Sequence, residues 1–131
     1  MQIKLSRLRQ LIRETYYNIP SGAKIKDVVD KWSSKGDKLY DDDVHAVFPA
    51  EEVWPYHEYT WSRDSARRSP DEWDELYEAM KKGGWSRKKP AVVLVGKNGK
   101  AKVGEGNHRL AMAMELGIDV PVVFEFRNSV D

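Results

Sequence analysis

Cysteine is absent from the 131-residue sequence. This absence excludes disulfide bonds, thiolate-bound zinc and a cysteine nucleophile, and it fits a reducing compartment. Long hydrophobic runs are absent too, since none approaches the roughly 18 to 20 apolar residues that span a bilayer. The first residues also lack the apolar centre of a secretory signal peptide. We therefore expect a cytoplasmic protein with no membrane association.

The sequence has no excess of charge of either sign. Its 22 Lys and Arg residues almost balance its 21 Asp and Glu residues, which leaves a net charge of +1 although 33% of the residues are charged. No global positive field therefore attracts nucleic acid, and any binding of a polyanion must depend on a local cluster.

The length fits one domain with a modest core, or a small domain preceded by a helical extension. We expect the second arrangement, with an extension at residues 1–43 and a domain at residues 44–131. Apolar residues at helical spacing predict helices at residues 5–17 and 23–34, and Gly36 is placed to end the second helix. These helices can form a hairpin, which could contact a protein partner.

The boundary is marked by the acidic run at residues 41–43, which favours a linker because consecutive carboxylates rarely converge on one metal ion. Residues 44–61 then mix aromatic residues with prolines, which predicts a short strand followed by an ordered loop. We expect the aromatic side chains of this loop to pack against the protein and not to stack on nucleobases.

A helix is predicted to begin after Ser69. Ser69 and Glu72 have the spacing of a capping box, and Pro70 occupies the first helical position, where its missing N–H costs nothing. The glycine pair at residues 83–84 can turn the chain out of this helix.

The remaining elements follow in a clear order. An apolar run at residues 91–95, an Asn-Gly pair at residues 98–99 and a returning strand at residues 100–103 predict a β-hairpin. A helix at residues 107–116 and a strand at residues 120–126 follow. The fold class is therefore α/β (α+β), with a small mixed sheet and flanking helices.

A glycine-rich turn joins the returning strand to the next helix. Its sequence is Gly104-Glu105-Gly106-Asn107-His108-Arg109. Glycine lets an anion approach backbone N–H groups closely, and a helix N-terminus favours negative charge. Because Arg109 can add a bidentate contact to phosphate, the turn predicts a phosphate-binding site.

Two common phosphate motifs do not match this turn. The dinucleotide fingerprint needs a third glycine and a long parallel βαβ unit, whereas the strand here belongs to a hairpin. The nucleotide loop that ends in Gly-Lys-Ser/Thr is absent from the sequence.

The sequence Gly106-Asn107-His108-Arg109, with Ala113 four residues further on, resembles the signature turn of the ParB/sulfiredoxin-like superfamily. The capped helix, the hairpin, the helix after the turn and a final Val-Pro-Val strand at residues 120–122 also resemble that superfamily. The resemblance covers residues 44–127, about two thirds of the chain.

The resemblance implies different activities for different branches of the superfamily. Sulfiredoxins have a cysteine where this chain has Asn107, so we expect no sulfiredoxin activity. ParB proteins bind CTP through a turn of which only Gly106, Arg109 and the small residue Ala113 are matched here. Other relatives are free-serine kinases and plasmid or phage proteins assigned nuclease or ATPase activity, which often carry an acidic residue where this chain has Glu105.

The chemistry of the turn suggests roles for its residues. We expect catalytic roles for Glu105, His108 and Arg109. We expect nucleotide or phosphate contacts from Gly104, Gly106, Asn107, His108 and Arg109. Arg109 can neutralise phosphate charge, and His108 can transfer a proton near neutral pH. Glu105 or Glu72 could hold a magnesium ion, so the expected cofactor is ATP or CTP with Mg²⁺.

Simpler roles remain open for these residues. Arg109 could pair with an acidic residue of the helix that follows Ser69, His108 could bond a carbonyl group, and Glu105 could be exposed. Upstream, Arg63, Arg67 and Arg68 could close over the same anion, or they could be solvated loop charges.

The leading functional hypothesis is a protein that binds a nucleotide or phosphate at residues 104–109 and hydrolyses NTP, or cleaves DNA with a metal ion. One alternative is a non-catalytic module of a phage or mobile element that binds DNA or a protein. Another is a small-metabolite kinase resembling the free-serine kinases.

Overall fold

The computed structural model describes residues 23–42 and 44–131. In chain order the elements are α2 (Ile25–Lys35), β1 (Ala46–Pro49), α3 (Ala50–Val53), the 3-10 helix η1 (Trp54–Tyr56), α4 (Pro70–Gly83), β2 (Ala91–Gly96), β3 (Ala101–Glu105), α5 (Asn107–Leu116) and β4 (Asp119–Arg127). The helix predicted at residues 5–17, and with it the predicted helical hairpin, lies outside the described residues.

The four strands form one mixed sheet in the order β1-β4-β2-β3. The central strands β4 and β2 are parallel, and each outer strand is antiparallel to its neighbour. The chain makes the tight turn predicted at Asn98-Gly99, where Gly99 has φ of 82°, and then crosses through α5 to reach β4. The predicted α/β (α+β) class with a small mixed sheet is therefore confirmed for the described part of the chain.

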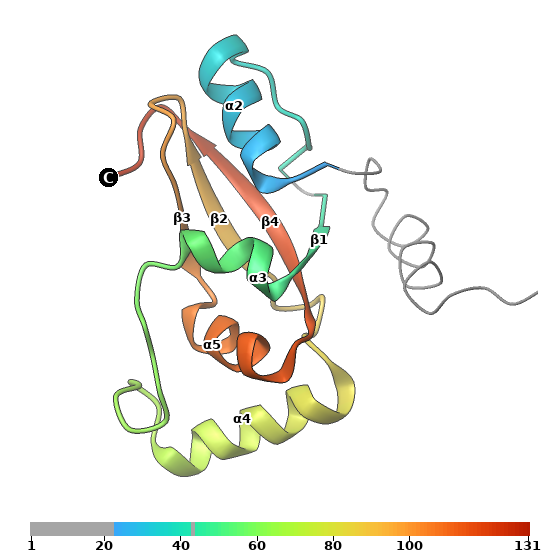
Figure 1. The fold of residues 1–131 in the computed structure, drawn as a ribbon, viewed down its shortest axis with the longest axis vertical. Helices are drawn as coiled ribbons and strands as arrows, with labels where there is room; N and C mark the ends of the chain where they lie inside the picture. Colours follow the sequence, from blue (N-terminus) through green and yellow to red (C-terminus); the bar gives the residue numbers. More distant parts are fainter. Residues whose placement is uncertain (1–22, 43) are drawn as a thin grey trace, which may run out of the picture.

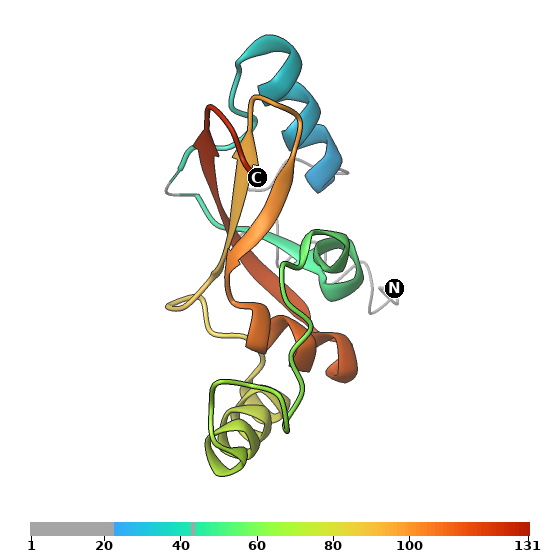
Figure 2. The ribbon, with the colours of Figure 1, turned by 90° about the vertical axis from the view of Figure 1, so that its left-hand side faces the viewer.

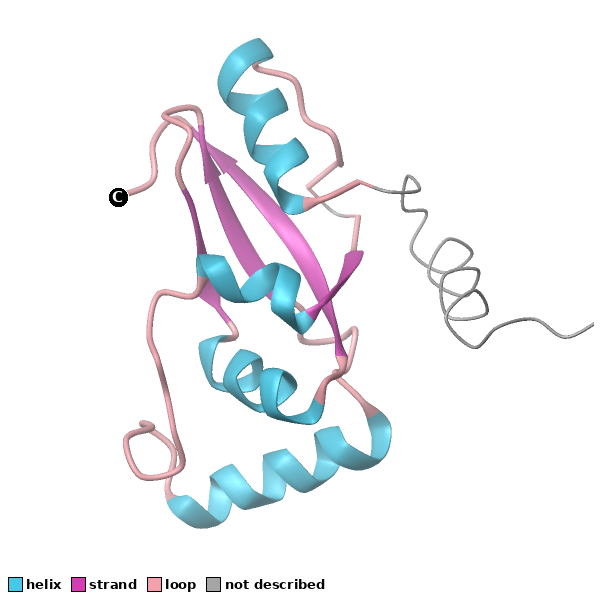
Figure 3. Cartoon of the chain, viewed as in Figure 1, coloured by secondary structure: helices cyan, strands magenta, loops and turns pink. Residues whose placement is uncertain are grey.

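Helices α2, α3 and α5 lie on one face of the sheet, and α4 packs against α5 beyond the end of the strands (Figures 1 and 2). The core between these layers includes Val93 and Val95 of β2 and Val122 and Phe124 of β4, all of them without solvent exposure. Figure 3 shows that a long loop separates η1 from α4.

Helix α2 shares this core although its residues were expected to belong to an extension. Ile25 and Val28 are completely buried. Trp32 donates its indole N–H to the carbonyl of Arg127 at the end of β4 (2.9 Å), and the N–H of Ile25 donates to Glu52 of α3 (3.2 Å). The division at residue 43 remains a prediction.

Local sequence signals account for several element ends. Ser69 accepts a hydrogen bond from the N–H of Glu72 (3.2 Å) and its hydroxyl donates to the carboxylate of Glu72 (3.0 Å), so α4 begins where predicted. Gly36 and Gly117 end α2 and α5 with φ of 65° and 66°. Among the helices in the described ranges, none combines the length and the apolar character that crossing a membrane requires.

Two details differ from the sequence prediction. A four-residue helix, α3, and η1 follow β1 where a loop was expected, because elements this short carry no readable periodicity. Strand β3 also continues through Gly104 to Glu105, since Glu105 pairs with Val92 across an irregularity in the register. Gly104 and Glu105 therefore belong to the strand, and the turn itself is confined to Gly106.

Candidate functional site

The junction between β3 and α5 depends on Gly106. This residue has φ of 105°, a conformation that side-chain-bearing residues rarely adopt. A Cβ atom there would lie 3.2 Å from the Cα of Ala91 and 3.2 Å from the indole ring of Trp85. Both the backbone conformation and the packing therefore require glycine at the start of α5.

Asn107 holds the turn in place through its side chain. The residue is buried, with 8% of its surface exposed. Its Nδ2 donates to the carbonyl of Val103 (3.0 Å), and its Oδ1 accepts from the N–H of Glu58 (3.1 Å). Because both polar atoms of the side chain bond within the protein, the group of Asn107 that remains for a bound anion is its backbone N–H.

The N-terminus of α5 supplies unpaired donors. The first intrahelical hydrogen bond runs from the N–H of Leu110 to the carbonyl of Gly106 (2.8 Å). The N–H groups of Asn107, His108 and Arg109 precede it and have no acceptor within the helix. They point out of the positive end of the helix dipole, which favours an anion.

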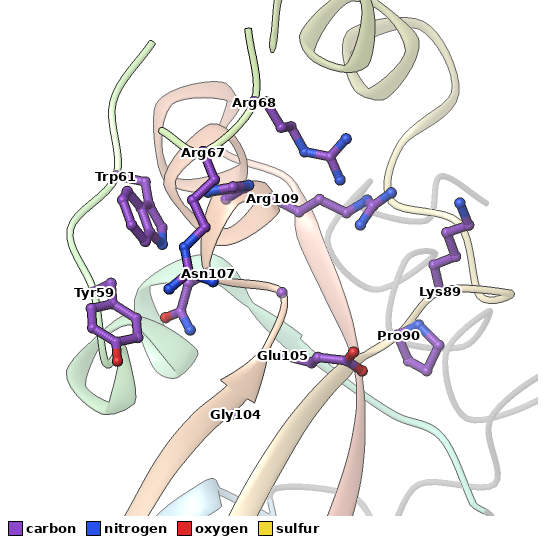
Figure 4. A pocket seen from close by; sticks show the side chains of 12 residues that line it. Tyr59, Trp61, Arg67, Arg68, Lys89, Pro90, Gly104, Glu105, Asn107 and Arg109 are labelled. Atoms are coloured by element: carbon purple, nitrogen blue, oxygen red, sulfur yellow. The ribbon is translucent and has the colours of Figure 1, made fainter. Parts of the chain in front are cut away.

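The loop between η1 and α4 is folded back over this helix start. Ser62 and Ser65 close a tight turn by bonding each other's N–H groups (2.9 and 3.3 Å). Arg63 forms a bidentate ion pair with Asp74 of α4, at 2.8 and 2.9 Å. The next two arginines of the loop, Arg67 and Arg68, extend toward side chains of α5 (Figure 4).

These elements enclose a cavity of about 400 Å³, called the site cavity below. Its lining consists of Tyr59, Trp61, Arg67, Arg68, Lys89, Pro90, Gly104, Glu105, Gly106, Asn107, His108 and Arg109. All six residues of the predicted turn are thus brought together, and two of the three loop arginines join them. The third, Arg63, is engaged by Asp74 instead.

Three cationic side chains of the site cavity, those of Arg68, Arg109 and Lys89, form no ion pair within the described residues. Figure 4 shows the guanidinium groups of Arg68 and Arg109 next to each other, with the Lys89 ammonium group on the far side. The Nε of Arg68 is buried without a hydrogen-bond partner. A buried, unpaired guanidinium nitrogen is costly and favours a bound acceptor.

The pKa of Arg109 also reflects its position beside Arg68 without a carboxylate partner. Burial lowers the pKa of this guanidinium from its usual value, and the adjacent charge of Arg68 lowers it further. Neither cause is relieved by an acidic side chain. A bound anion would remove the repulsion between the two arginines.

His108 lies in an aromatic and electropositive environment. Its ring is 5.0 Å from Trp61 and 5.9 Å from Trp73, with an edge-to-face geometry in both pairs. Burial lowers the pKa of His108 below its usual value, and the positive charges of Arg68, Arg67 and Arg109 lower it further. Both causes favour the neutral form of the imidazole, which can accept a proton.

Of the two glutamates predicted to hold a magnesium ion, Glu105 lines the site cavity and Glu72 does not. Glu105 is exposed and lines the site cavity beside Pro90, apart from the arginines (Figure 4). Glu72 does not line the cavity, and its carboxylate accepts a hydrogen bond from the hydroxyl of Ser69. In the described part of the chain, no group of three or more His, Asp or Glu side chains is arranged to hold a metal ion.

Sequence reasoning missed Lys89, and it placed Tyr59 and Trp61 only in packing roles. The hairpin contained a signal for Lys89: β2 and β3 are antiparallel, so residues just before β2 lie beside residues just after β3. No comparable signal marked Tyr59 and Trp61, because the path of the long loop follows from tertiary contacts such as the pair between Arg63 and Asp74.

Comparison with known proteins gave no match among family models, curated proteins or solved structures. The candidate site is therefore defined by its own geometry.

Proposed function

We propose that the site cavity binds the phosphate groups of a nucleotide or a nucleic acid, and that the protein carries out phosphoryl chemistry there. The observation that carries this proposal is the juxtaposition of Arg68 and Arg109, which lie together without a carboxylate partner over the N-terminus of α5. Bidentate guanidinium contacts and free backbone N–H groups both fit the oxygens of phosphate.

A phosphate chain fits the donors of the site cavity better than a carboxylate ligand does. Two adjacent guanidinium groups, an ammonium group and the N–H groups of a helix start supply more donors than a carboxylate can accept, whereas a phosphate chain offers several acceptor oxygens. A cavity of about 400 Å³ has the size of a small-molecule pocket.

We propose hydrolysis of an NTP or metal-dependent cleavage of a phosphodiester as the reaction. The oxygen of a water molecule forms a bond to phosphorus, the bond from phosphorus to the leaving oxygen breaks, and the proton of the water passes to the neutral imidazole of His108. Arg109 stabilises the charge that develops on the phosphoryl oxygens. Glu105 would hold a magnesium ion, which would supply further charge neutralisation.

The order of elements supports a ParB/sulfiredoxin-type fold as part of the same proposal. The capped helix α4, the hairpin of β2 and β3, the helix start at Gly106 and the Val-Pro-Val segment of β4 follow one another as the resemblance implies. Asn107 then replaces the thiol of sulfiredoxins with a structural amide.

Calorimetric titration of ATP and CTP with Mg²⁺ tests the binding proposal. We expect Arg68→Ala and Arg109→Ala each to weaken binding roughly 10- to 150-fold, because a hydrogen bond to a charged group contributes about 1.5–3 kcal/mol. Arg127→Ala is the matched control, since Arg127 is exposed and pairs with Glu125 at the opposite end of the sheet.

Turnover is measured with the same variants on NTPs and on DNA. His108→Gln and Glu105→Gln are expected to reduce turnover more than they reduce binding. Binding or turnover that survives both arginine substitutions unchanged would show that the site lies elsewhere.

A further inference from the structure

A second hollow adjoins the site cavity. Its volume is about 620 Å³, and it lies between the second half of α4 and the segment at residues 84–89. Leu76 and Met80 of α4 form an apolar part of its wall, and Lys88 lies on its rim. Lys89 and Arg109 line both hollows. The two hollows therefore adjoin at these two side chains, and together they are called the basic groove below.

The basic groove carries a strong local charge in a nearly neutral chain. Apart from Arg87, its two linings contain five cationic side chains, Arg67, Arg68, Lys88, Lys89 and Arg109, and one carboxylate, Glu105. The whole chain has a net charge of only +1. Positive charge is thus concentrated along a path longer than one phosphate group needs.

Aromatic rings lie at one end of the basic groove. Tyr59 is 48% exposed, and its ring centre is 5.5 Å from that of Trp61. The guanidinium group of Arg67 lies 5.9 Å from the centre of the Trp61 ring. An exposed aromatic ring beside a row of cations is the arrangement by which proteins hold unpaired bases and the backbone that joins them.

We infer that the ligand of the basic groove is a single-stranded nucleic acid. One phosphate lies at Arg68 and Arg109, the backbone continues past Lys89 to Lys88, and a base stacks on Tyr59. This inference rests on the proposed phosphate site and specifies its substrate class. A mononucleotide is too short to occupy the second hollow as well as the first. A duplex keeps its bases paired, so none of them can stack on Tyr59.

Fluorescence anisotropy with labelled oligothymidylates of 2 to about 12 nucleotides tests the inference, with EDTA present so that no cleavage occurs. We expect affinity to rise with length until the groove is filled. Lys88→Ala should reduce the slope of log K against log salt concentration by about 0.7, the value for one phosphate contact on a single strand.

Substitution of Tyr59 tests the stacking contact. Tyr59→Ala is expected to weaken binding roughly 5- to 150-fold, the equivalent of about 1–3 kcal/mol per stacked base, whereas Tyr59→Phe keeps the ring and the affinity. A blunt duplex of the same length should bind more weakly than the single strand.

The outcomes separate the inference from the proposal on which it rests. If ATP binding requires Arg68 and Arg109 but oligonucleotide affinity neither rises with length nor depends on Lys88 and Tyr59, the inference is overturned and the phosphate site stands. A duplex that binds as tightly as the single strand also overturns the inference. If substitution of Arg68 and Arg109 affects neither ligand, the phosphate site itself is wrong.

Discussion

His108 is the residue in the site cavity with the most unusual surroundings. Two indole rings flank its imidazole, and three arginines raise the positive potential around it. The same cations make the imidazole a weaker base than a free histidine, although they favour its unprotonated form, which can accept a proton from a water molecule that attacks phosphate. A bound phosphate would raise the pKa of His108, because negative charge stabilises the imidazolium form.

We predict that the pKa of His108 lies below about 6.5, the value of a free histidine, and rises when phosphate or ATP binds. An NMR titration of the imidazole protons measures both values, and His108→Gln assigns the signal among the three histidines of the chain.

The same shift makes stability depend on pH. The unfolded chain takes up the proton first as pH falls below about 6.5, so this group lowers the free energy of unfolding between that pH and its folded pKa. A pKa at or above the free value in the unliganded protein would contradict the electrostatic description of the site.

Asn107 illustrates what a sequence position reveals and what it does not. Its place after Gly106 identified it as part of the turn, and the structure places it in the lining of the site cavity. Its two structural hydrogen bonds could not be foreseen, because Glu58 is 49 residues away in the sequence and reaches Asn107 only through the fold.

At the scale of elements, the loop from η1 to α4 determines whether the arginines reach the helix start. It carries Arg67 and Arg68 and is fastened to α4 by Arg63 and Asp74. Hydrogen bonding to Arg63 lowers the pKa of the Asp74 carboxyl, as expected for a persistent pair. About half of each side chain is exposed, so the pair contributes little to overall stability.

We predict that Arg63→Ala and Asp74→Ala both weaken nucleotide binding, because each releases the loop. Simple electrostatics predicts opposite effects, since the first substitution removes a positive charge near an anion site and the second removes a negative one. Calorimetric titration of ATP into each variant distinguishes the two explanations. Tighter binding by Asp74→Ala would show that the pair acts only through its charge.

The ends of helices and the hairpin turn could be predicted where the signal lies in neighbouring residues. The cap at Ser69, the Asn-Gly turn and the glycine that ends α5 each depend on neighbouring residues, and the structure bears out all three. The length of β3 depends on its pairing with β2, which is why Gly104 and Glu105 were expected in the turn.

At the scale of the molecule, α2 contributes to the same core as the sheet. Ile25 is completely buried and belongs to the cluster that includes Val93 and Phe124. The hydrogen bond from Trp32 to the end of β4 adds a second connection. Sequence periodicity predicted the helix, but it contains no information on which surface the apolar side covers.

We predict that Ile25→Ala lowers the free energy of unfolding of the whole described fold by about 2–5 kcal/mol, as for other buried aliphatic side chains cut to alanine. Denaturation followed by circular dichroism and by tryptophan fluorescence should give one coincident transition. Lys26→Ala, on the exposed side of α2, is the control. If Ile25→Ala left the main transition unchanged, α2 would be an extension independent of the domain.

Strand β3 leads into the site and is also an outer strand of the sheet. Outer strands can pair with a strand of another molecule when nothing lies beside them. Here the segment after η1 runs along that side (Figure 1), where Glu58 forms an ion pair with Lys102 of β3 (3.2 Å) and bonds Asn107. We therefore expect substitutions that displace this segment to expose the edge of β3 and promote self-association. The same substitutions should also weaken ligand binding, because Glu58 bonds Asn107.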